Sequence, residues 1–115
     1  MRRFALALAL AAPLAVATAT ARPAAACLGP AAPHLAHLAA SGIATETLVG
    51  APMARALDLL RARVDFDEAP TRIVVAFGEH RAAVWLIVDA QLCNIIHGPA
   101  EGVRAILRAA RGEGV

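Results

Sequence analysis

The sequence predicts a small α+β domain in which an antiparallel sheet of three to four strands carries two helices on one face. Three short stretches rich in β-branched residues follow one another at 71–77, 82–89 and 92–97, with links of only a few residues. Parallel strands need long crossover connections, so the short links favour an antiparallel meander. Two stretches with apolar residues at helical spacing flank this meander, which gives the expected order β-α-β-β-β-α.

The start of the chain has the three parts of a secretory signal peptide. Arg2 and Arg3 form a basic segment, residues 4–21 contain no charge, and the small residues at 19–21 suit cleavage after Ala21. The apolar stretch is mostly alanine and contains a proline, which makes it too weakly hydrophobic for a membrane anchor. We therefore expect an exported protein, periplasmic or secreted, with no integral membrane segment after cleavage.

A second small-x-small pattern at 24–26 directly precedes Cys27 and leaves two alternatives open. Cleavage after Ala26 would compete with cleavage after Ala21. The same pattern half resembles the lipobox of bacterial lipoproteins, which implies a lipid on Cys27 and a membrane tether. A lipobox has a leucine-like residue three positions before the cysteine, where this chain has Ala24.

The net charge depends on removal of the signal peptide. The full chain carries a formal charge of +2, but loss of Arg2 and Arg3 leaves nine arginines and nine acidic residues. Nucleic-acid binding draws on excess positive charge. The balanced mature chain therefore argues against a nucleic-acid partner.

The segment between the signal peptide (1–21) and the domain (43–115) is an Ala/Pro-rich leader at 22–42 that we expect to be flexible. Within the leader, 34–42 has the composition of two helical turns that end at Gly42. The domain itself begins with a short alternating strand at 45–49.

The predicted helices flank the meander. The first spans 52–64, with Pro52 in its first turn and one apolar stripe formed by Met53, Leu57, Leu60 and Val64. The second is opened by Gly98 and Pro99 and stopped by Gly112. Between them, the strand at 82–89 is apolar at every position from Val84 to Val88, and this predicts a central strand covered on both faces. The helices would cover one face, and the N-terminal segment or a second subunit would cover the other. Trp85 lies within this run, so we expect it in the core.

Cys93 and His97 come closest to a catalytic pair. In a strand they would share a face about 13 Å apart, four residues at roughly 3.3 Å each. A nucleophile and its base must approach to about 3 Å. We therefore assign no catalytic residue and no cofactor, and an enzyme built on the Cys93 thiol is the weakest of the function classes.

The simplest partner for Cys93 is Cys27, because an exported chain with two cysteines most simply forms a disulfide. This bond would pin the leader across the sheet. Closing a loop of that length stabilises a protein by roughly 4 kcal/mol in the chain-entropy model. Lipidation of Cys27 would exclude the disulfide, because the sulfur would no longer be free.

A metal site is the alternative for the same residues. His34 and His37 are three positions apart and would lie on one side of a helical turn. With the two cysteines they form a possible Cys₂His₂ set for zinc or copper(I). The spacing from Cys27 to His34 matches no compact zinc module.

Three function classes stay open. The first is an exported, non-enzymatic binding or interaction module cross-linked by a disulfide, which engages a protein or a second copy through a sheet face, a sheet edge or a helix. The second is a periplasmic zinc- or copper-binding protein, and the third is an enzyme. The continuous apolar strand and the lack of a catalytic constellation favour the first class, with a ligand that the sequence does not identify.

Overall fold

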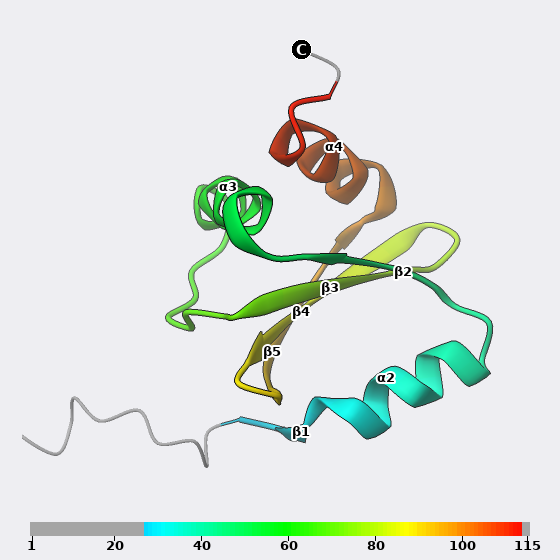
Figure 1. Ribbon diagram of the computed structural model, residues 1–115. Helices are drawn as coiled ribbons and strands as arrows, with labels where there is room; N and C mark the ends of the chain where they lie inside the picture. Colours follow the sequence, from blue (N-terminus) through cyan, green and yellow to red (C-terminus); the bar gives the residue numbers. More distant parts are fainter. Residues whose placement is uncertain (1–26, 114–115) are drawn as a thin grey trace, which may run out of the picture.

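The computed structural model describes residues 27–113 and confirms the α+β class (Figure 1). The predicted signal peptide and both cleavage positions, Ala21 and Ala26, lie outside the described residues. The described part contains a five-stranded antiparallel sheet and three helices, which is one strand and one helix more than the largest count expected. In chain order, these elements are β1 (Gly29–Pro30), α2 (Ala31–Ala40), β2 (Ala44–Leu48), α3 (Gly50–Arg61), β3 (Arg72–Phe77), β4 (Arg81–Val88), β5 (Gln91–Pro99) and α4 (Ala100–Ala110).

The sheet has the strand order β1-β5-β4-β3-β2, and every neighbouring pair is antiparallel. The predicted central strand, β4, therefore lies in the middle of the sheet. Helices α3 and α4 cover one face, and α2 lies on the opposite side (Figure 1). The N-terminal segment is thus the second cover that the apolar run in β4 required.

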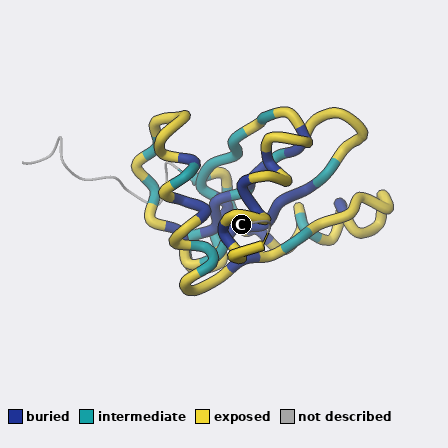
Figure 2. Tube along the Cα trace, turned by 90° about the horizontal axis from the view of Figure 1, so that it is seen from above, coloured by how far each residue is buried: buried dark blue, intermediate teal, exposed yellow. Residues whose placement is uncertain are grey.

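The main core lies between the sheet and the pair α3 and α4. Buried residues concentrate there, whereas the loops and the outer sides of the helices are exposed (Figure 2). Side chains at alternate positions of the central strands point into this core, as the period of a strand requires. Its fully or nearly buried members include Leu57, Leu60, Ile73, Val75, Val84, Leu86, Val103 and Leu107.

A smaller second core lies on the face that α2 covers. Ala31 brings the start of α2 against Val74, Ile87 and Leu92, and all four residues are buried. Leu35, Trp85 and Ile95 pack around them and are partly buried. The predicted flexible leader therefore contains an ordered strand and helix, because this apolar face of the sheet gives them a surface to pack on.

The β4–β5 hairpin has two irregular features. Its turn consists of Asp89 and Ala90, which both have positive φ, at 47° and 73°. Two residues with positive φ are the requirement of a type I′ turn, whose twist matches that of the strands. The register shifts near Leu86 and Ile87, which pair with Asn94 and Leu92, so Cys93 has no partner on β4. This bulge breaks the simple alternation that we expected along the strand.

Candidate binding pocket

A side-chain hydrogen bond joins helices α3 and α4 at one end of the pair. Arg55, in the first half of α3, donates from Nε to the Ala110 carbonyl at the end of α4, at 2.6 Å. Arg111, directly after α4, forms an ion pair with Glu46 of β2. The hydrogen bond fixes the first half of α3 to the end of α4, and the ion pair fixes the end of α4 to β2. At the opposite end, the side chains of the two helices leave space between them.

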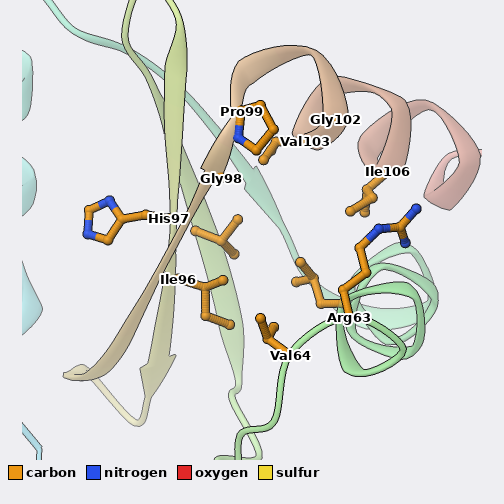
Figure 3. Close-up of a pocket in the computed structure, with 11 residues that line it drawn as sticks. Arg63, Val64, Ile96, His97, Gly98, Pro99, Gly102, Val103 and Ile106 are labelled. Atoms are coloured by element: carbon orange, nitrogen blue, oxygen red, sulfur yellow. The ribbon is translucent and has the colours of Figure 1, made fainter.

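This space is a pocket of about 230 Å³ above the sheet (Figure 3). The end of α3 and the following turn form one wall, and the start of α4 forms the other. Strands β4 and β5 form the floor. The lining residues are Leu60, Arg63, Val64, Val84, Ile96, His97, Gly98, Pro99, Gly102, Val103 and Ile106.

The predicted helix 52–64 ends earlier than expected, and this shapes one wall of the pocket. α3 ends at Arg61, and the amides of Arg63 and Val64 both donate to the Leu60 carbonyl in a tight turn. Val64 therefore leaves the apolar stripe of the helix and is 39% exposed at the pocket.

Two glycines keep the opposite wall open. Gly98 is the second-last residue of β5 and Gly102 lies in the first turn of α4, and neither has a side chain to fill the space. A Cβ at Gly102 would lie 3.6 Å from the Pro99 ring, and a Cβ at Gly98 would lie 3.6 Å from Val103. Both are ordinary contact distances, so alanine fits at either position and would narrow the pocket.

The lining is almost entirely apolar. Leu60, Val84, Val103 and Ile106 are each at most 8% exposed. His97 contributes to the lining, but its ring points away from the other lining residues (Figure 3). Such a surface binds by the hydrophobic effect and offers little for acid–base or nucleophilic chemistry.

The volume limits the size of a ligand. An apolar cavity of about 150 Å³ is large enough for benzene, and pockets for drug-sized molecules begin at about 300 Å³. The pocket lies between these values. It has room for one ring or a short alkyl chain.

Arg63 is the one charged side chain among the lining residues. It is exposed, and its Nη1 donates to the Leu59 carbonyl at 3.2 Å. No carboxylate within residues 27–113 forms an ion pair with Arg63. The mouth of the pocket therefore combines an apolar interior with a cation.

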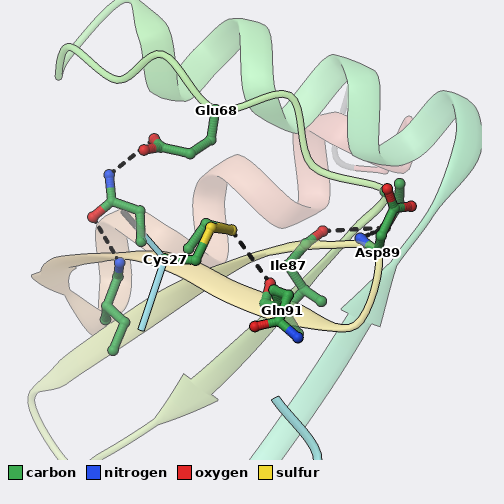
Figure 4. Close-up of a disulfide and its surroundings, with 9 residues drawn as sticks. Cys27, Glu68, Ile87, Asp89 and Gln91 are labelled. Atoms are coloured by element: carbon green, nitrogen blue, oxygen red, sulfur yellow. Dashed lines mark hydrogen bonds between the residues drawn. A yellow bond between two sulfur atoms is a disulfide. The ribbon is translucent and has the colours of Figure 1, made fainter. Parts of the chain in front are cut away.

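The two cysteines lie away from the pocket and form the expected disulfide, Cys27–Cys93 (Figure 4). Neither cysteine is free. The disulfide leaves no thiolate for nucleophilic attack or metal binding, and no sulfur on Cys27 for a lipid. Nearby, Nδ2 of the Asn94 side chain donates to Oε1 of Glu68 at 3.1 Å, and Oδ1 of the same side chain accepts from the backbone N–H of Ile95 at 2.8 Å. The hydrogen bond to Glu68 anchors the loop before β3 to β5.

His34 and His37 are exposed on α2. The ring of His34 meets Trp85 edge-on, with the ring centroids 6.1 Å apart. Between Cys27 and Glu113, no group of three or more His, Cys, Asp or Glu side chains is placed to hold a metal ion. The structure therefore does not assemble the Cys₂His₂ set that the sequence allowed.

Two further observations bear on function. In the part of the chain that the structure describes, no helix has both the length and the apolar character needed to cross a membrane. No protein-family model, no curated protein and no solved structure matches this chain.

Proposed function

We propose that the protein is an exported, non-enzymatic binding module that takes a small, mainly apolar ligand into the pocket between α3, α4 and the sheet. The observation that carries this proposal is the apolar space of about 230 Å³ that the side chains of the protein leave unfilled. The side chains that line this space lack dispersion contacts on the side that faces it. A pocket that opens to the surface lets a ligand supply those contacts.

Export is the second part of the proposal, and the disulfide supports it. Disulfides form and persist in oxidising compartments, and Cys27 and Cys93 are paired. We propose cleavage after Ala21, which leaves Cys27 close to the mature N-terminus. The intact mass of the protein isolated from the periplasm or medium tests this: we expect a chain that begins at Arg22, two mass units lighter than its reduced form. A chain that keeps its first 21 residues would contradict export by this route.

The affinity for a simple probe follows from burial of its tail. Each buried methylene contributes about 0.8 kcal/mol, so a five-carbon tail contributes about 4 kcal/mol. Because association also costs translational and rotational freedom, this free energy sets about 1 mM as the tightest dissociation constant for such a probe. Hexanamide, which has such a tail and no charge, is therefore a suitable probe.

The test is a titration with hexanamide followed through the NMR signals of the methyl groups of Val84, Val103 and Ile106. We expect these signals to shift and to saturate at millimolar concentrations. The Gly102→Ala variant narrows the pocket by one methyl group and should bind about fourfold more weakly, the effect of one displaced methylene. Its stability should not fall, because alanine favours a helix over glycine.

Ala109→Ser is the matched control, because it adds one atom at an exposed position of the same helix outside the pocket. This variant should bind hexanamide as the wild type does. Methyl signals that do not move at millimolar hexanamide would refute the proposal. Equal affinity in the wild type and Gly102→Ala would place binding elsewhere.

A further inference from the structure

We infer that the pocket selects monocarboxylates, with the apolar tail of the ligand between the helices and its carboxylate on the guanidinium of Arg63. This inference rests on the proposed function and adds the class of ligand. The tail would be a short alkyl chain or a single ring, because the pocket measures about 230 Å³.

The pocket lining carries positive charge and no negative charge. Arg63 is the one charged residue in the lining, which contains no Asp or Glu. A ligand with a positive group would meet this cation, whereas a carboxylate would be attracted to it. A fully apolar ligand would leave the guanidinium without a role in binding.

Arg63 differs from Arg61, Arg104 and Arg111, whose guanidinium groups have partners. Arg61 lies over the Phe66 ring at 4.8 Å, and Arg104 lies over the Phe77 ring at 4.4 Å. Arg111 pairs with Glu46. Arg63 uses Nη1 for the Leu59 carbonyl, and no acidic side chain among residues 27–113 lies within ion-pair distance of it. A guanidinium has five N–H donors in a planar fork, so donors remain for a carboxylate.

The arrangement of the side chains gives the ligand a direction. Arg63 extends beside Ile106 at the edge of the pocket, while Ile96 lies on the side of the sheet (Figure 3). A tail can therefore pack toward the sheet while the carboxylate stays at the rim, next to Arg63 and in water. A charge at the rim avoids the cost of burying an ion in an apolar interior.

The test compares hexanoate with hexanamide, which have the same tail and the same number of non-hydrogen atoms. The titration uses the full chain and the methyl signals of Val84, Val103 and Ile106. We expect hexanoate to bind about 1.5- to 5-fold more tightly than hexanamide at low salt, the range that corresponds to an exposed ion pair of about 0.2–1 kcal/mol. The preference should shrink in high salt, because salt screens exposed charges.

Arg63→Gln should abolish the preference, because it should weaken the binding of hexanoate more than that of hexanamide and make the two affinities equal. Arg63→Lys keeps the charge without the planar fork and should retain a smaller preference. Arg108→Gln is the matched control: it removes one positive charge from an exposed residue of α4 outside the lining, and the preference should persist. Each variant is first checked for an unchanged unfolding midpoint.

The outcomes separate the two proposals. Equal binding of hexanoate and hexanamide by the wild type would overturn carboxylate selection and leave the apolar pocket intact. A preference that survives in Arg63→Gln would also overturn it, because the selecting group would then be another one. If neither probe binds, the proposed function fails together with this inference.

Discussion

Removal of the disulfide should destabilise the protein by a large and calculable amount. The bond joins Cys27 and Cys93, which are 66 residues apart in the sequence. In the chain-entropy model, release of a loop of this length costs about 4 kcal/mol. A domain of this size has a total stability of about 5–15 kcal/mol. Replacement of both cysteines by serine should therefore remove a substantial part of the free energy of unfolding.

The assay is chemical denaturation of the wild type and the Cys27→Ser/Cys93→Ser variant, each with and without reductant. Trp85 is the only tryptophan, and it packs in the second core that α2 covers, so its fluorescence reports on the part of the fold that the disulfide holds. The reduced wild type should match the variant, and the variant should not respond to reductant. A loss below about 1 kcal/mol would refute the loop-closure reasoning.

Three further changes have defined expected outcomes. Leu86→Ala truncates a side chain of the central strand that is 0% exposed. It should lower the free energy of unfolding by about 2–5 kcal/mol in a denaturant titration, and a loss below about 1 kcal/mol would mean that this core position is not packed as described. Ala90→Gly should raise the free energy of unfolding by about 0.5–1 kcal/mol, because Ala90 has φ 73° next to Asp89 in the turn; a destabilised variant would contradict the turn geometry. Glu46→Gln breaks the ion pair with Arg111, which is partly exposed. It should lower the free energy of unfolding by at most about 1 kcal/mol in low salt and by less in high salt. A larger loss that does not depend on salt would show another role for Glu46.

Most elements of the main sheet and its two helices could be predicted from apolar periodicity. The β-branched run at 71–77 became β3, and the continuous apolar run from Val84 to Val88 became the central strand β4. These patterns are strong because burial on one or both faces dictates residue type at every position. The disulfide could be predicted because only two cysteines were available to pair.

The segment that covers the second face of the sheet, β1 and α2, was predicted less well. The helical composition at 34–42 was recognised, but the helix starts at Ala31 and follows the two-residue strand β1. A strand of two residues has no period to detect, and its place depends on β5 and the disulfide. The ordering of this segment is therefore a tertiary effect, set by residues more than sixty positions away.

The pocket could not have been predicted from the sequence, because a space between two helices depends on how their ends diverge. Leu60, Val103 and Ile106 read as ordinary core residues, and they are buried ones. The only local signals were Gly98 and Gly102, two residues without side chains around the start of a helix. Isolated glycines are tolerated in helices, so this signal alone identified no site.

The central claim is that a small apolar molecule binds between α3, α4 and the sheet. Its most direct test is the set of intermolecular nuclear Overhauser effects between the alkyl protons of hexanamide and the protein. The proposal predicts contacts with the methyl groups of Val84, Val103 and Ile106 and none with the ring of Trp85, which lies on the opposite face of the sheet. Contacts confined to Trp85 or to the exposed side chain of Leu28 would contradict it.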